Sequence, residues 1–146
     1  MESGYLGRSR DTARAMSQEN VEMVRLGYEA ANRGDIDGLL DLCAADIEWQ
    51  DVVPDARSAQ GKDGVRAYFE TVWEPWEEIR REPEEIIDLG GDQVLVLFHL
   101  TGRGKGSGIE IDLRGGDLLT IREGRLGRWM AYTDRAQALE AAGLSE

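Results

Sequence analysis

The chain has 146 residues, a formal net charge of −12 and a single cysteine, Cys43. Its length suits one domain with its own core, and its acidic surface repels nucleic-acid phosphates and anionic membranes, so neither is an expected partner. A lone cysteine cannot form an internal disulfide, which fits a reducing, cytoplasmic setting.

The first fifteen residues differ from the rest of the chain. Residues 1–15 contain arginines but no apolar block that could act as a secretory signal, and no part of the chain has the ~18 consecutive apolar residues of a membrane span. A second methionine, Met16, stands where the regular pattern begins. We predict that residues 1–15 are a disordered tail, or reflect a start codon assigned too far upstream, and that residues 16–146 form a single domain.

The first third of the domain predicts two helices. Apolar residues recur at helical spacing from Ser17 to Arg33, where Ser17 can cap the start. Asp35 can cap a second, shorter helix that carries Ile36, Leu39, Leu40 and Cys43.

A short strand and a third helix follow. Residues 47–51 alternate between apolar and polar side chains, as in a half-buried strand. Pro75 should interrupt the next helix near its end. One face of that helix carries Val65, Tyr68, Phe69, Val72 and Trp76.

The second half of the chain changes to a period of two. Strands are predicted over residues 84–89, 93–101, 109–121 and 126–133, joined by glycine-containing turns. Asp134 can cap a closing helix over residues 135–142, and the charged run EEIRREPEE is interpreted as a solvated face. Helices followed by an antiparallel meander predict an α+β fold.

Asp51 is the first candidate for proton chemistry. It shares a strand face with Ile47 and Trp49, so burial should favour its uncharged form and make it a better proton acceptor. The alternative is that Asp51 only caps the turn toward Pro54.

Asp117 is the second candidate. Counting in twos, it falls on the apolar face of its strand with Leu119 and Ile121, where an acid needs either a partner or a proton. A protonated Asp117 could donate a hydrogen bond to a developing oxyanion. The alternative is a bulge at Gly115 and Gly116 that turns the side chain outward.

The remaining candidates have equally plain structural alternatives. His99 lies mid-strand between two apolar faces and could be catalytic or simply packed, but without further His or Cys residues nearby it predicts no transition-metal site. Asp134 could orient a proton, although its context favours a helix cap. Six aromatic side chains could line a ligand site or form the core: Tyr28, Trp49, Tyr68, Phe69, Trp73 and Trp129.

Three segments carry a resemblance to a known family. They are SQENVEMVRLGYEAANRGDIDGLLDLCAADIEW, GKDGVRAYFE and LLTIREGRLGRWMAYTDRAQALEAAGL, which span most of residues 17–144. Together they resemble the SnoaL-like polyketide cyclases, in the superfamily of nuclear transport factor 2, ketosteroid isomerase and scytalone dehydratase. The resemblance implies a cone-shaped, curved antiparallel sheet wrapped around N-terminal helices, a pocket at its open end, and homodimers that pair through the outer sheet face.

The resemblance also implies roles for single residues. Asp51 matches the catalytic base of ketosteroid isomerases, and Asp117 matches their oxyanion-hole acid. Tyr28 lies one position away from the isomerases' helix tyrosine, and one position is ~100° around a helix, so we expect its hydroxyl to point away from the site. Asp134 matches the acid/base aspartate of the SnoaL cyclases.

These features together predict a pocket for a small apolar or aromatic ligand with a carbonyl group. The leading hypothesis is proton abstraction next to that carbonyl without a cofactor or metal, giving isomerisation, cyclisation or dehydration. Asp51 or Asp134 would be the base, and Asp117 and His99 would stabilise developing charge. The alternatives are a non-catalytic ligand-binding domain and a dimeric interaction module.

Overall fold

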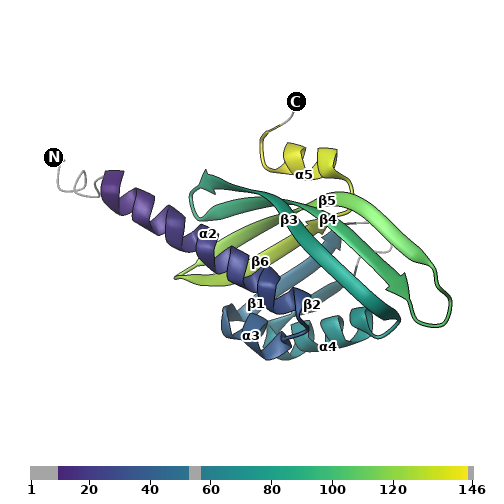
Figure 1. Cartoon of the computed structure of the whole chain (residues 1–146). Coiled ribbons are helices and arrows are strands. Elements are labelled where there is room, and N and C mark those ends of the chain that lie inside the picture. Colours follow the sequence, from purple (N-terminus) through teal and green to yellow (C-terminus); the bar gives the residue numbers. More distant parts are fainter. Residues whose placement is uncertain (1–9, 53–56, 145–146) are drawn as a thin grey trace.

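The described residues, 10–52 and 57–144, form a single sheet with helices on both faces in a computed structural model. Helices α2 (Arg10–Asn32), α3 (Ile36–Asp41) and α4 (Gly61–Trp73) lie on one face, and the short helix α5 (Arg135–Ala141) lies on the other (Figure 1). We call these the inner and the outer face. The predicted α+β class is confirmed.

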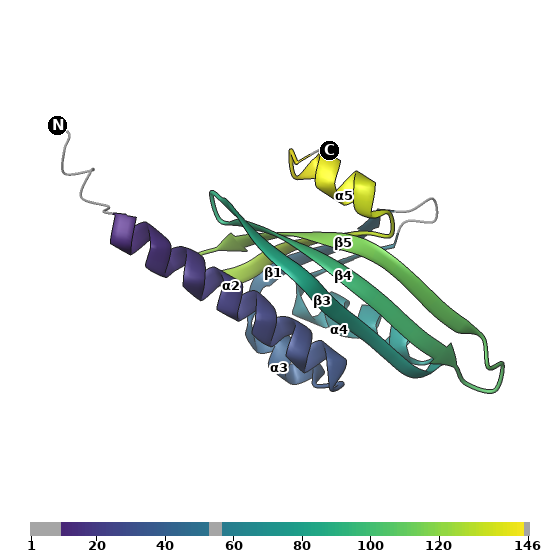
Figure 2. The same ribbon diagram turned by 45° about the horizontal axis from the view of Figure 1, so that its top comes forward.

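The sheet has six strands in the order β2-β1-β6-β5-β4-β3. The last four along the chain form an antiparallel meander, and β1 joins it by pairing in parallel with β6. The sheet is curved and unclosed, with the N-terminal helices on its inner face (Figure 2). The strands are β1 (Cys43–Val52), β2 (Ser58–Gln60), β3 (Trp76–Gly90), β4 (Gln93–Gly104), β5 (Glu110–Arg122) and β6 (Arg125–Tyr132).

The charged run EEIRREPEE is part of strand β3, which begins at Trp76 and not at the predicted residue 84. Six of its seven charged side chains are exposed, as a solvated face requires, and Arg81 is the exception. β3 is an edge strand, where charged residues and a proline are tolerated because one row of backbone groups needs no partner. The ladder is irregular between Pro83 and Glu85, next to that proline. Trp76 begins β3 and does not continue the helix, since α4 ends at Trp73, two residues before Pro75.

Two further element boundaries differ from the expected ones. Helix α2 begins at Arg10, before the predicted Ser17, while residues 1–9 of the proposed tail lie outside the described residues. Cys43 is the first residue of β1 and not the end of a helix. It is buried, and burial raises the pKa of its thiol to about 11.

Asp35 caps α3 as predicted, accepting a hydrogen bond from the Gly38 amide at 2.9 Å.

The larger core lies between the inner face and helices α2, α3 and α4. It includes Val24, Tyr28, Leu39, Ile47, Trp49, Val65, Phe69, Val96, Leu119 and Trp129. A smaller cluster on the outer face joins Leu95 and Leu97 of β4 to Ala138 of α5. This second cluster explains why both faces of β4 are apolar. Among the described helices, none combines the length and apolar composition needed to cross a bilayer.

Candidate functional site

Asp51 and Asp117 lie in one row on the inner face of the sheet. Asp51 on β1 pairs in register with Ala131 on β6, and Ala131 pairs with Asp117 on β5. The parallel row two residues away is buried and apolar: Trp49, Trp129 and Leu119. Two strand spacings put the Cα atoms of the aspartates about 10 Å apart. Both aspartates therefore face the helices, as the alternation predicted.

Asp51 is held by two donors from the aromatic cluster. The Trp49 indole Nε1 donates to its Oδ1 at 3.0 Å, and the Tyr68 hydroxyl lies 2.8 and 2.7 Å from its two oxygens. Burial raises the pKa of the Tyr68 hydroxyl, and the hydrogen bond and charge of Asp51 raise it further. Tyr68 therefore stays protonated and fixes the Asp51 carboxylate in one orientation.

Asp117 is fully buried, as expected, but it has a cationic partner. The Arg81 guanidinium donates from Nε to Oδ2 at 2.9 Å and from Nη2 to Oδ1 at 3.0 Å. Burial alone would lower the pKa of Arg81, but the charge and hydrogen bonds of Asp117 outweigh it and raise that pKa. Of the two possibilities that the sequence left for Asp117, a partner or a proton, the structure shows the partner. Asp117 is an ion-pair carboxylate that accepts hydrogen bonds, not an acid that donates one.

Arg81 is the site residue that the sequence analysis missed. It lies in the charged run EEIRREPEE, where strand alternation turns Arg81 inward while its neighbours Arg80 and Glu82 are exposed. The available signal was the period of two through Ile79, Arg81 and Pro83, all less exposed than the residues beside them. In a charged run this signal is weak, because both the buried and the exposed face of the strand carry polar side chains.

Tyr28 also occupies a different position from the one expected. Its hydroxyl donates to Asp117 Oδ2, and the side chain is 1% exposed. The offset of one helix position from the isomerase tyrosine does not turn the Tyr28 hydroxyl away from Asp117. The angle at which α2 crosses the sheet decides where the buried face of the helix points. Burial, followed by the charge of Asp117, raises the pKa of Tyr28.

A cavity of about 50 Å³ lies between helix α4, the end of α2 and strands β3 and β4. Four of the six predicted aromatic residues line it, namely Trp49, Tyr68, Phe69 and Trp73, together with Asn32, Arg81 and Leu100. The other two lie behind this wall: the Trp129 ring stacks on Trp49 at 4.5 Å between centroids, and Tyr28 contacts Trp129 at 5.3 Å. Tyr68 and Arg81 therefore bring the Asp51 and Asp117 networks to one cavity.

His99 lies on the outer face, away from this cavity. Its position on β4 shares the alternation of Leu95 and Leu97, and its Nε2 is 2.7 Å from Asp112 Oδ1. The expectation of a buried His99 was wrong, since a quarter of its side chain is exposed. The structure does not place His99 beside Asp51 or Asp117.

Asp134 caps helix α5 on the outer face. Its carboxylate accepts a hydrogen bond from the Ala136 amide at 2.9 Å, and the residue is exposed. The preferred interpretation of Asp134 as a helix cap is confirmed. Asp134 is not among the residues that line the inner cavity.

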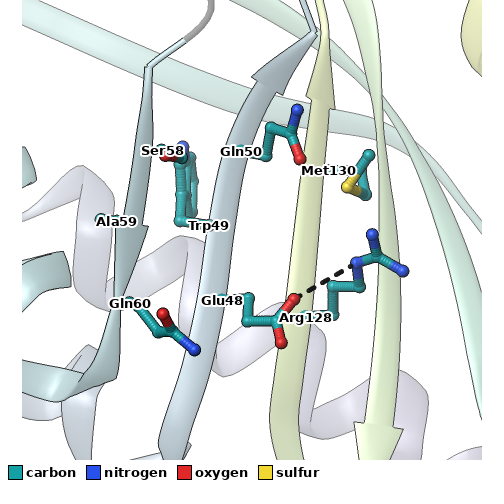
Figure 3. Close-up of a pocket in the computed structure, with 8 residues that line it drawn as sticks. All are labelled: Glu48, Trp49, Gln50, Ser58, Ala59, Gln60, Arg128 and Met130. Carbon is teal, nitrogen blue, oxygen red and sulfur yellow. Dashed lines mark ion pairs between the residues drawn. The ribbon is translucent and has the colours of Figure 1, made fainter.

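A larger hollow, of about 400 Å³, lies on the outer face over β2, β1 and β6 (Figure 3). Its walls are mainly polar, and Glu48 and Arg128 form an exposed ion pair across it at 3.8 Å. Trp49 is the one aromatic residue that lines it, whereas four aromatic residues line the inner cavity and one of them, Tyr68, holds Asp51. We therefore regard the smaller inner cavity as the functional site. Within residues 10–52 and 57–144, no group of three potential metal-ligating side chains occurs.

Comparisons with known proteins agree with this architecture. The family model described as SnoaL-like domain matches residues 24–129. An NTF2-like protein from Burkholderia xenovorans is 32% identical, with 86% of this chain and 95% of that chain covered and a TM-score of 0.67. An NTF2-like protein of unknown function from Burkholderia pseudomallei is 26% identical, with 84% and 95% covered and a TM-score of 0.71. TerC, crystallised with polyporic acid, is 22% identical, with 86% and 98% covered and a TM-score of 0.70. A search of curated protein sequences found no match.

Proposed function

This chain belongs to the SnoaL-like domain family, and from that premise we propose that it removes a proton next to the carbonyl of a small apolar or aromatic compound. Isomerisation, cyclisation or dehydration of that compound would follow without a cofactor. The observation that carries the proposal is that Tyr68 lines an aromatic cavity together with Arg81 and holds the Asp51 carboxylate directly behind it. A carboxylate can act as the base in enolate formation, and a cationic hydrogen-bond donor can stabilise the developing oxyanion.

In this proposal Asp51 is the base. Tyr68 and Trp49 hold its carboxylate, so little rearrangement precedes proton transfer. As Asp51 takes the proton, negative charge moves to the substrate oxygen on the Arg81 side of the cavity. The aromatic walls exclude water and provide an apolar surface for the substrate. Asp117 positions Arg81, because its bidentate ion pair fixes the plane of the guanidinium.

The cavity size limits how a substrate can bind. A volume of about 50 Å³ accepts only a few heavy atoms, whereas pockets for drug-sized ligands measure ~300–1,000 Å³. Partly exposed residues, including Trp73, Ile79 and Leu100, form the mouth. We infer that the carbonyl end enters the cavity and the rest of the ligand lies outside. The crystallisation of TerC, which shares the fold, with polyporic acid supports a small-molecule role.

A second candidate function is ligand binding without turnover. The observation that favours it is that both Asp51 oxygens already lie within hydrogen-bond distance of the Tyr68 hydroxyl, so a substrate would have to compete with that donor for the carboxylate. The two candidates differ in a single measurement, the transfer of a substrate proton to solvent.

The test is hydrogen–deuterium exchange next to the carbonyl of phenylacetone in D₂O, followed by NMR. We expect wild-type protein to accelerate exchange, and Asp51→Asn to slow it by ~100-fold or more, because a general base contributes ~10²–10⁴-fold. Asp46→Asn is the matched control, since Asp46 is an exposed acid on the same strand. Equal exchange by wild type and Asp51→Asn would exclude Asp51 as the base. Binding without exchange by either would identify a ligand-binding domain.

We also propose that the protein is a homodimer that pairs through the outer face over β1 and β6. The family resemblance implies this arrangement. Helix α5 covers the neighbouring part of that face over β4 and β5 and leaves the surface of Figure 3 open.

A further inference from the structure

Arg81 has one occupied edge and one open edge. A guanidinium presents five N–H donors and two edges at which paired donors can bind paired oxygens. Asp117 occupies the Nε/Nη2 edge with bonds of 2.9 and 3.0 Å. Within the described part of the chain, Nη1 donates to no residue, and 23% of the side chain is accessible. The Nη1/Nη2 edge therefore keeps unpaired N–H donors, and Arg81 is one of the residues that line the cavity.

Two further residues fix the position of Arg81. The Asn32 side chain donates to the Arg81 carbonyl at 2.9 Å and accepts from the Arg81 amide at 2.8 Å, which ties α2 to β3. The Phe98 ring lies against the guanidinium plane, with Cζ 4.0 Å from its centroid. A cation held by a carboxylate, an aromatic ring and its own backbone loses little freedom when it binds a ligand.

The charges around the cavity favour an uncharged ligand. Arg81 and Asp117 neutralise each other, and Asp51 leaves one negative charge behind the lining residue Tyr68. Tyr68, between them, is a neutral donor whose hydroxyl is already directed at Asp51. A ligand carboxylate would add a second negative charge facing Asp51, whereas a neutral carbonyl gains charge only as Asp51 loses it.

We propose that the Nη1/Nη2 edge of Arg81 binds the carbonyl oxygen of an uncharged ketone-type ligand and discriminates against carboxylates. This inference deepens the proposed function, on which the choice of a carbonyl ligand rests. Arg81 is then the specificity-determining residue of the cavity, and Asn32 and Asp117 are positioning residues that act through it.

The test compares three ligands of similar shape by tryptophan-fluorescence titration at pH 7.5. They are phenylacetone, its hydrocarbon analogue methallylbenzene, in which a methylene group replaces the oxygen, and phenylacetate. We expect wild-type protein to bind phenylacetone at least tenfold more tightly than either of the others. The ketone-to-hydrocarbon ratio isolates the contribution of the oxygen, because the apolar contacts are matched.

Two variants remove the open edge in different ways. Arg81→Lys keeps a cation for Asp117 but has no second edge, and the double variant Arg81→Met/Asp117→Leu removes both charges together, so that neither is left buried alone. In both, we expect the affinity for the ketone to fall to within about twofold of the affinity for the hydrocarbon. Arg80→Met is the matched control, since Arg80 is the adjacent, 60% exposed arginine.

The outcomes separate this inference from the proposed chemistry. An unchanged ketone preference in Arg81→Lys and in the double variant, or tightest binding of phenylacetate by wild type, overturns it. An Arg81-dependent preference in a protein that exchanges no substrate proton supports the recognition site and rejects the proton transfer. Exchange that depends on Asp51 but occurs without an Arg81-dependent preference rejects only the recognition site.

Discussion

Asp117, Arg81 and Tyr28 form a buried polar cluster in which every member depends on the others. The Asp117 carboxylate accepts from both Arg81 and Tyr28 and has no exposed surface. Desolvating a carboxylate is costly, and the bidentate cation offsets that cost only while it stays in place. Removing the charge of one member of this cluster should therefore cause a large loss of stability.

We expect Asp117→Asn to lower the free energy of unfolding by about 3 kcal/mol at pH 7, because it leaves the Arg81 cation without its counter-charge. Urea denaturation followed by circular dichroism measures the change. Asp112→Asn is the control, since Asp112 is an exposed acid, and it should change stability by less than about 0.5 kcal/mol. A stability equal to wild type in Asp117→Asn would show that the ion pair contributes nothing.

The two site tyrosines should make the fold sensitive to alkali. Burial and the adjacent aspartates raise the pKa of Tyr28 and of Tyr68, so the folded protein favours their neutral forms. Their contribution to stability is complete below the unfolded value of about 10 and is lost as pH rises above it. Absorbance at 295 nm should show these two ionising only as the protein unfolds. Tyr28→Phe should flatten the decline of stability above pH 10; an unchanged decline in Tyr28→Phe and in Tyr68→Phe would contradict the assignment.

At the scale of the elements, a glycine allows helix α5 to pack closely against strand β5. A Cβ atom built on Gly116 of β5 would lie 2.5 Å from the Cβ of Ala138, a fully buried residue of α5. Arg135 at the start of α5 donates to the Phe98 carbonyl at 2.9 Å and fixes the same contact. The close approach of helix and strand therefore requires a residue without a side chain at position 116.

We expect Gly116→Ala to lower the free energy of unfolding by about 1–3 kcal/mol, because the helix must move away from the strand. Gly64→Ala is the matched control. A Cβ at Gly64, in helix α4, meets only ordinary contacts at 3.9 Å, so alanine there should stabilise the protein by about 0.5–1 kcal/mol. Thermal melts of both variants measure the difference, and a neutral Gly116→Ala would show that α5 is loosely seated.

At the scale of the whole molecule, the outer face is divided between two kinds of surface. Helix α5 covers its apolar part at Leu95 and Leu97, while Glu48, Gln50, Arg128 and Met130 remain open over β1 and β6. The proposed dimer uses this second, more polar part. Met130 lies in the hollow beside Gln50 (Figure 3), where a partner could bury it.

We expect sedimentation analysis at micromolar concentration to give the mass of a dimer. Met130→Glu should shift the equilibrium toward monomer, because it would bury an unpaired charge between the partners. Arg103→Glu, on the exposed far end of β4, should leave the mass unchanged. A monomeric wild-type protein would reject the dimer without affecting the inner site.

The sequence by itself determined the features that follow from local stereochemistry. Alternation along β1 and β5 was sufficient to turn Asp51 and Asp117 toward one core, and helical spacing was sufficient to place Val24 and Tyr28 on the buried face of α2. These periods are properties of the backbone, so they can be read from a few neighbouring residues.

Only the tertiary structure decided which side chains meet. Arg81 lies 36 residues from Asp117 and Tyr28 lies 89 residues from it, so their contacts depend on strand order and on the angle at which α2 crosses the sheet. His99 could not be assigned to a face, because α5 makes the outer side of β4 as apolar as the inner side. Local periodicity specifies a direction for each side chain, but packing between distant segments specifies its partner.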